Sequence, residues 1–146
     1  MIPFMNVWVT PVSLDEINAR CRGSFSDHLQ IAFTDFDHNS LTAKMPIEKT
    51  SMQPMGIMHG GASAALAETV GSAAANYCVD QSKEYCVGLD LNINHLRPVT
   101  GGYIESIATP LHLGSKTQVW EIKIFDTSRK LVSIARLTLM VLKKGG

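Results

Sequence analysis

Apolar and polar residues alternate along much of the second half of the chain, with the two-residue period of a half-buried β-strand. The clearest run lies just before His95, which falls on its apolar side, and its apolar positions are Val87, Leu89, Leu91 and Ile93. Three further strands are predicted between short polar or glycine-containing turns, over residues 103–113, 117–125 and 131–142. We therefore expect four consecutive strands in this part of the chain, the last three of them forming a meander.

The first part of the chain combines a short helix with a hairpin. A capping-box pattern that begins at Ser13 predicts a helix running to about Cys21 and closed by Gly23. Two strand-like runs follow, separated by a cluster of residues typical of a tight turn. These runs cover residues 30–37 and 41–47.

A long apolar helix is predicted between the two groups of strands. The loop 48–58 leads into the run 60–79, which is rich in alanine and glycine and carries Glu68 near its centre. A carboxylate at that depth argues against a membrane span, so we expect a buried helix. The order of elements predicts one α+β domain over residues 1–146, with the helix packed on one face of an antiparallel sheet.

Composition narrows the classes of partner. The chain has 146 residues, the size of a single domain, and its 13 Lys and Arg balance 13 Asp and Glu. No net field would therefore draw it to nucleic acid or to an anionic membrane. The three cysteines are odd in number and lack metal-ligand spacing, and the first residues do not form a basic and apolar leader. We expect a cytoplasmic protein with neither a membrane nor a nucleic-acid partner.

Glycines stand where the long helix should begin. His59, Gly60 and Gly61 expose backbone N–H groups that have no partner within the helix, and the aligned peptide dipoles there favour negative charge. Such an end could hold the oxyanion of a reacting carbonyl. A simpler alternative is that these glycines only cap the helix and allow close packing.

Glu68 is the acidic residue that could work with this turn. It lies among alanine, leucine and valine, so we expect its carboxylate to be buried and to need a partner. Ser72, one turn further on the same face, could hold a water beside it. Alternatively, Glu68 faces solvent on an ordinary amphipathic helix. Gln53 and His95 are weaker candidates, which could equally be a solvated loop residue and a core histidine.

The sequence lacks the patterns of several other chemistries. His59 and Glu68 have no second histidine at helical spacing, so we expect no metal site. There is no Gly-x-Ser-x-Gly elbow, no Cys or Ser beside a histidine in a nucleophilic pattern, and no phosphate-binding P-loop. What remains is a helix N-terminus for an oxyanion and a carboxylate for attack or base catalysis.

Three segments resemble known proteins in their order and spacing. The first reads Gln-Pro-Met-Gly-Ile-Met-His-Gly-Gly over residues 53–61 and is followed by Glu68; the others are 87–97 and 110–126. They resemble the hotdog-fold thioesterases of the 4-hydroxybenzoyl-CoA thioesterase superfamily, and most closely the group of 1,4-dihydroxy-2-naphthoyl-CoA hydrolases of the menaquinone pathway. The resemblance implies an antiparallel sheet wrapped around one long helix. It also implies hydrolysis of an acyl-CoA, with an aromatic or medium acyl group, to free acid and CoA.

The resemblance also implies roles for individual residues. Glu68 would be the catalytic carboxylate, acting as nucleophile or as general base on water. Gln53 and His59 would contact the thioester, the Gly60 N–H would polarise its carbonyl, and Ser72 would help to position the water.

On the substrate side, the resemblance implies that His95 lines the acyl pocket. Five positions would lie near the coenzyme A arm: Arg97, His112, Gly114, Ser115 and Lys116. Three methionines near the site suggest an adaptable apolar lining, although core packing explains them equally well: Met52, Met55 and Met58. No cofactor is expected, because coenzyme A is part of the substrate.

The resemblance further implies a homo-oligomer, in which the site lies between two subunits and dimers pair into tetramers. Two other functions stay open at this point. One is a hotdog-fold hydratase or dehydratase acting on acyl thioesters. The other is a domain that binds acyl-CoA without catalysis.

Overall fold

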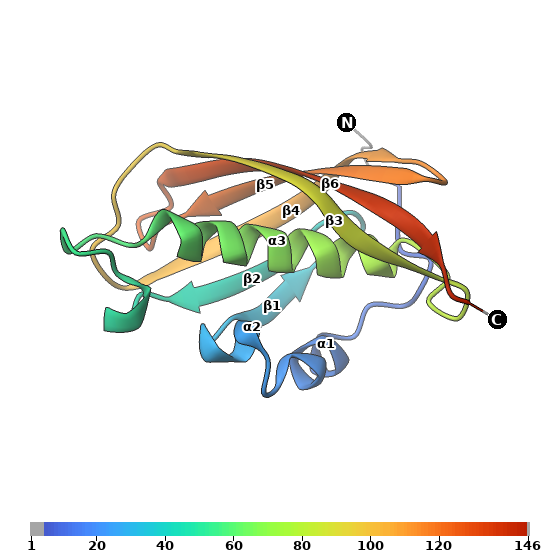
Figure 1. Cartoon of the computed structure of the whole chain (residues 1–146), viewed down its shortest axis with the longest axis horizontal. Helices are drawn as coiled ribbons and strands as arrows, with labels where there is room; N and C mark the ends of the chain where they lie inside the picture. Colours follow the sequence, from blue (N-terminus) through green and yellow to red (C-terminus); the bar gives the residue numbers. More distant parts are fainter. Residues whose placement is uncertain (1–4, 146) are drawn as a thin grey trace.

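The computed structural model describes residues 5–145, in which one long helix lies against a six-stranded antiparallel sheet (Figure 1). The strand order is β1-β2-β4-β5-β6-β3. This is the α+β hotdog arrangement that the resemblance implies. The elements are α1 (Leu14–Cys21), α2 (Phe25–His28), β1 (Ala32–Phe36), β2 (Leu41–Pro46), the 3₁₀ turn η1 (Lys49–Ser51), α3 (Gly60–Tyr77), β3 (Glu84–His95), β4 (Tyr103–Leu113), β5 (Thr117–Phe125) and β6 (Leu131–Lys143).

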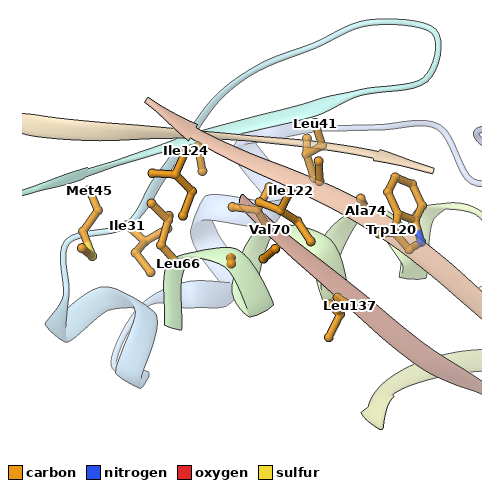
Figure 2. Close-up of a cluster of buried hydrophobic side chains, with 14 of the residues drawn as sticks. Ile31, Leu41, Met45, Leu66, Val70, Ala74, Trp120, Ile122, Ile124 and Leu137 are labelled. Carbon is orange, nitrogen blue, oxygen red and sulfur yellow. The ribbon is translucent and has the colours of Figure 1, made fainter. Parts of the chain in front are cut away.

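The core lies between α3 and the sheet (Figure 2). Leu66 and Val70 on α3 are fully buried, as are Ile122 and Leu137 on the facing strands. Each such side chain contributes roughly 1.5–3 kcal/mol by leaving water. Small residues let α3 come close to the sheet: a Cβ on Gly71 would stand 2.7 Å from the Leu137 side chain. The burial of apolar α3 side chains confirms the predicted helix packing.

The N-terminal helix forms as predicted. The Ser13 hydroxyl accepts a hydrogen bond from the Glu16 N–H at 3.3 Å, and Gly23, with a positive φ of 74°, lies just beyond the helix. The sequence prediction omitted α2, which follows directly. It is a four-residue helix with no buried side chain, so it leaves no apolar period in the sequence.

The predicted meander of the last three strands is confirmed, because β4, β5 and β6 are neighbours in chain order. The strand before them, β3, pairs with β6 and lies at the far edge of the sheet. The predicted inward set of β3 is partly wrong, because a bulge between Gly88 and Asp90 shifts the alternation by one residue. Leu91 and Ile93 pack against the core as expected, whereas Val87 and Leu89 are exposed.

Because β3 is an edge strand, one of its two sides is unpaired. β3 has 12 residues, and its outer edge pairs with no other strand in the described part of the chain. Exposed edges of this kind are ready to pair with a strand of another chain. No helix among residues 5–145 combines the length and the apolarity needed to cross a bilayer.

Candidate active site

The N-terminal end of α3 presents a free hydrogen-bond donor. His59 caps the helix: its Nδ1 accepts the Gly61 N–H at 2.8 Å, and its own N–H donates to the Ser51 carbonyl at 2.8 Å. The Gly60 N–H has no hydrogen-bond acceptor among residues 5–145. Because the helix dipole places partial positive charge at this end, the unpaired N–H is suited to a carbonyl oxygen that gains negative charge.

A cavity of about 350 Å³ opens beside this end of α3. Four residues that the resemblance singled out line it: Gln53, Gly60, His95 and Arg97. The Gln53 side-chain oxygen accepts the Met55 N–H, which leaves its amide NH₂ as a donor. Met58 also lines this cavity, which we call the helix-end cavity.

His59 lies in a neighbouring cavity rather than in the helix-end cavity. This second space, of about 360 Å³, is also lined by Met52, Phe25 and His28. Of the three methionines, Met55 lines neither space and is 85 % exposed. In a single chain, therefore, His59 and Gln53 do not line one common pocket.

The two glycines after His59 make room for imidazole rings. A Cβ on Gly60 would stand 2.8 Å from His95 Nε2, and a Cβ on Gly61 would stand 2.9 Å from His59 Nδ1. Both distances are too short for a side chain. The glycines thus have a packing role, and at Gly60 this packing brings a histidine ring to the free N–H.

The expectation that Glu68 is buried is wrong for the single chain, in which this side chain is exposed. Its neighbours Leu66 and Ala67 face the core, whereas the Glu68 carboxylate reaches over the edge strand at Gly88. A Cβ on Gly88 would stand 2.5 Å from Glu68 Oε1. Within the described chain, the carboxylate makes no hydrogen bond and no ion pair, so it is available at the open edge of the sheet.

One chain keeps the carboxylate and the free N–H apart. Glu68 and Gly60 are separated by about 12 Å along the helix axis, at 1.5 Å per residue. A reacting carbonyl that accepts a hydrogen bond from the Gly60 N–H is therefore out of reach of the same chain's Glu68, because attack requires about 3–3.5 Å.

A third cavity, of about 280 Å³, lies between α1 and α3. Ser72 lines it and follows Glu68 by one turn on the same face, as predicted. The remaining lining combines apolar and aromatic residues, including Ile17, Phe33 and Tyr77, with polar ones such as Asn76. We call this space the α1–α3 cavity.

The cysteines are unsuited to nucleophilic attack. All three are free thiols, and burial raises the pKa of Cys78 to about 12 and that of Cys86 to about 11. Burial, followed by the charge of Asp27, also raises the pKa of Cys21. Among residues 5–145, no three His, Cys, Asp or Glu side chains gather into a group that could hold a metal.

The residues expected near the coenzyme A arm separate into two places. Arg97 lines the helix-end cavity. The other four lie at the opposite end of the molecule, with His112 near the end of β4 and Gly114, Ser115 and Lys116 in the turn that follows it (Figure 1). The turn is closed by a hydrogen bond from the Gly114 N–H to the Thr117 carbonyl at 2.9 Å. His112, Ser115 and Lys116 are exposed.

Sequence reasoning missed two residues at the helix-end cavity, and one of them, Ser133, lines it. Ser133 on β6 and Ser63 on α3 are fully buried or nearly so, and their hydroxyls lie 3.2 Å apart. The Ser133 hydroxyl is also 3.2 Å from His95 Nδ1. The available signal was a polar residue at an inward position of the apolar run 131–142.

Comparison with known proteins identifies the family. The profile described as the Thioesterase superfamily matches residues 55–133, which include the start of α3 and Glu68. The chain belongs to the thioesterase superfamily. A Vibrio cholerae relative, named provisionally as an esterase, is 47% identical over 94% of this chain and 91% of its own length. The 1,4-dihydroxy-2-naphthoyl-CoA hydrolase of Escherichia coli is 39% identical over 93% of this chain and 99% of its own.

Solved structures support the same assignment. A thioesterase from Haemophilus influenzae superposes with a TM-score of 0.91 at 42% identity, covering 94% of this chain and 95% of that one. A mutant thioesterase from Pseudomonas aeruginosa gives a TM-score of 0.93 at 43% identity, covering 94% and 99%. The fold and the hydrolase class of this superfamily member follow from these matches.

Proposed function

We propose that this thioesterase-superfamily protein hydrolyses an acyl-CoA to the free acid and CoA, at a site shared between two copies of the chain. The proposal rests on the distance between the oxyanion donor and the carboxylate within one chain. The free Gly60 N–H and the exposed Glu68 carboxylate are about 12 Å apart along one helix. A second copy supplies the missing half of each site.

The unpaired edge of β3 supports this arrangement. Glu68 reaches over Gly88, the fifth of the 12 residues of β3, and His95, which packs against Gly60, is the last residue of the strand. When two β3 strands pair in antiparallel fashion along their open edges, the first residues of one strand lie opposite the last residues of the other. When the pairing is centred between Gly88 and His95, Glu68 of one subunit lies beside Gly60 of its partner.

The reaction then uses groups from both subunits. The thioester carbonyl oxygen accepts the Gly60 N–H of one subunit, with the Gln53 amide nearby. Glu68 of the other subunit either attacks the carbonyl carbon or removes a proton from the attacking water. The C–S bond breaks, CoA departs as the thiolate and takes up a proton, and the acid is released after one water has been consumed.

The α1–α3 cavity is the place that we propose for the acyl group. It opens along the Ser72 side of α3, on the face that carries Glu68, and Phe33 and Tyr77 contribute aromatic surface. Its volume of about 280 Å³ favours a compact acyl group, because ligand pockets typically measure about 300–1,000 Å³. This assignment replaces the sequence-based expectation that His95 lines the acyl pocket.

Pairing through β3 also brings together the two groups of residues expected at the coenzyme A arm. The β4–β5 turn lies on the Gly88 side of the sheet, because Thr117 pairs with Met140, and Met140 pairs with Val87. Two strand spacings, about 10 Å, separate Thr117 from Val87. In the proposed dimer, Arg97 of the partner approaches this side, so that Lys116 and Arg97 can both contact CoA phosphates.

Release of free thiol from a panel of acyl-CoAs tests the proposal. The panel contains aromatic acyl-CoAs, including 1,4-dihydroxy-2-naphthoyl-CoA, which the name of the Escherichia coli relative suggests, together with short-chain, long-chain and enoyl-CoAs. We expect the highest kcat/KM with a compact or aromatic acyl group, and membership of the menaquinone pathway if the naphthoyl substrate is preferred. Water addition to the enoyl-CoA without thiol release, or binding without turnover, would contradict the proposal.

A further inference from the structure

At the wall of the helix-end cavity, three side chains form a hydrogen-bonded row that the proposed reaction does not yet use, and two of them, His95 and Ser133, line the cavity. Ser63 on α3 donates its hydroxyl hydrogen to the Ser133 oxygen at 3.2 Å. The Ser133 hydroxyl is in turn 3.2 Å from Nδ1 of His95. Ser63 and Ser133 are 0 % and 1 % exposed, so water does not compete for these hydrogen bonds.

The direction of the row follows from its first bond. Since the Ser133 oxygen receives the hydrogen of Ser63, the hydrogen of Ser133 is left to be donated, and the acceptor within reach is His95 Nδ1. A neutral imidazole that accepts at Nδ1 carries its proton on Nε2. We propose that Ser133, supported by Ser63, is a positioning residue that fixes this tautomer of His95.

The tautomer decides whether the His95 nitrogen beside Gly60 carries a hydrogen. His95 Nε2 lies beside Gly60, at 2.8 Å from the position that a Cβ would take, and both residues line the helix-end cavity. In the proposed tautomer, two donors meet there: the free Gly60 N–H and the His95 Nε2–H. With the opposite tautomer, an unprotonated nitrogen would face the oxyanion and repel it.

This inference rests on the proposed hydrolysis for its catalytic meaning, but its first test needs no substrate. Two-dimensional ¹⁵N–¹H spectra of the imidazoles distinguish the two neutral tautomers, and the signal that disappears in His95→Gln identifies His95. We expect the neutral ring of the wild-type protein to carry its proton on Nε2. A proton on Nδ1 would overturn the inference and leave the proposed thioesterase activity untouched.

Variants supply the second test. In Ser133→Ala, His95 should populate both tautomers, and kcat should fall at least about tenfold with KM nearly unchanged. This loss is smaller than the roughly 10²–10³-fold loss that follows complete removal of an oxyanion donor, because one of the two tautomers still donates from Nε2. Ser133→Thr, which keeps the hydroxyl, should restore most of kcat. The matched control is Ser106→Ala, because Ser106 is a fully buried serine on β4 whose hydroxyl has no hydrogen-bond partner in the described chain.

The outcomes separate the two proposals. If Ser133→Ala keeps both the wild-type tautomer and the wild-type kcat, the positioning role is wrong. An equal loss of kcat in Ser106→Ala would also overturn it, because any buried serine would then have the same effect. If the wild-type protein releases no thiol from any acyl-CoA, the proposed function fails, while the spectra still decide the tautomer.

Discussion

The two halves of α3 differ in what they offer a substrate. At the N-terminal end, Gly60, Gln53 and His95 gather at a cavity with a free backbone N–H donor, and none of its described lining residues carries a carboxylate. The middle of the helix has a carboxylate, Glu68, but no free backbone N–H to hold an oxyanion, because helical N–H groups are already paired. A single chain therefore holds the donors and the carboxylate at two separate places. In the proposed dimer, a second chain at the open edge of β3 brings them together.

The largest effect is expected from Glu68→Gln. The substitution keeps the size of the side chain and removes its charge and basicity, so kcat should fall by roughly 10² to 10⁴ with little change in KM. Because Glu68 is exposed and makes no hydrogen bond or ion pair in the described chain, the thermal midpoint of the single-chain fold should hardly move. Steady-state kinetics and a melting curve check both parts, and retention of more than about a tenth of wild-type kcat would rule out the role of Glu68.

Gly88→Ala tests whether catalysis depends on the position of the Glu68 carboxylate over Gly88. The new Cβ would stand 2.5 Å from Glu68 Oε1, so the carboxylate has to move. Since a misplacement of about 1 Å can cost as much as a factor of about 10², we expect kcat to fall roughly 10- to 100-fold.

The matched control for this variant is Gly101→Ala. A Cβ at Gly101 meets no atom within 4 Å, and its backbone is not in the left-handed region. It should retain wild-type kcat. Equal activity of the two variants would show that the place of Glu68 over Gly88 is unimportant.

A smaller effect is expected at the β4–β5 turn. Lys116→Ala should raise KM roughly three- to tenfold with little change in kcat, because a surface cation contributes binding rather than chemistry. The difference should shrink as salt screens the phosphates. Lys123→Ala is the control, since Lys123 alternates with the buried Ile122 and Ile124 and so faces away from α3.

If Lys123→Ala raised KM as much as Lys116→Ala, a general charge effect would explain both. A loss confined to kcat would instead place Lys116 in the chemistry and contradict its proposed role in binding the CoA phosphates.

The smallest effect on activity is expected from treatment with a reagent that alkylates cysteine thiols. Burial raises the pKa of Cys78 to about 12 and that of Cys86 to about 11, so both stay protonated at pH 8 and thiolate appears only as the pH rises toward these values. Iodoacetamide should modify them at least about 100-fold more slowly in the native protein than in the unfolded chain, as followed by mass spectrometry. Rapid labelling with parallel loss of activity would reveal a cysteine in the reaction.

Most of the fold could be predicted from the sequence, because local patterns determine its elements. The alternation along β5 and the capping box at Ser13 predict their elements almost to the residue. The pairing of β3 could not be predicted, since an antiparallel strand carries no mark of which neighbour it joins. The bulge after Gly88 was also hidden, and it turns Val87 and Leu89 outward.

The candidate site could be predicted only in part, because motifs identify residues but do not show where their side chains point. Motif spacing identified Gly60 and Glu68, but the sequence does not show which strand the Glu68 side chain reaches. The expected burial of Glu68 followed from its apolar neighbours, yet these neighbours face the core while Glu68 itself lies at the sheet edge. Ser133 went unnoticed because a single serine in an apolar strand has no pattern of its own.

The most direct test of the shared site is complementation between two inactive variants. Glu68→Ala and Gln53→Ala chains are unfolded, mixed in equal amounts and refolded together. Half of the dimers formed at random contain both chains, and each of these has one intact site, so about a quarter of wild-type activity should return. The control replaces the Gln53→Ala chain with the doubly substituted chain and should stay inactive. Mixtures that never exceed the two parent variants would contradict a site shared between subunits.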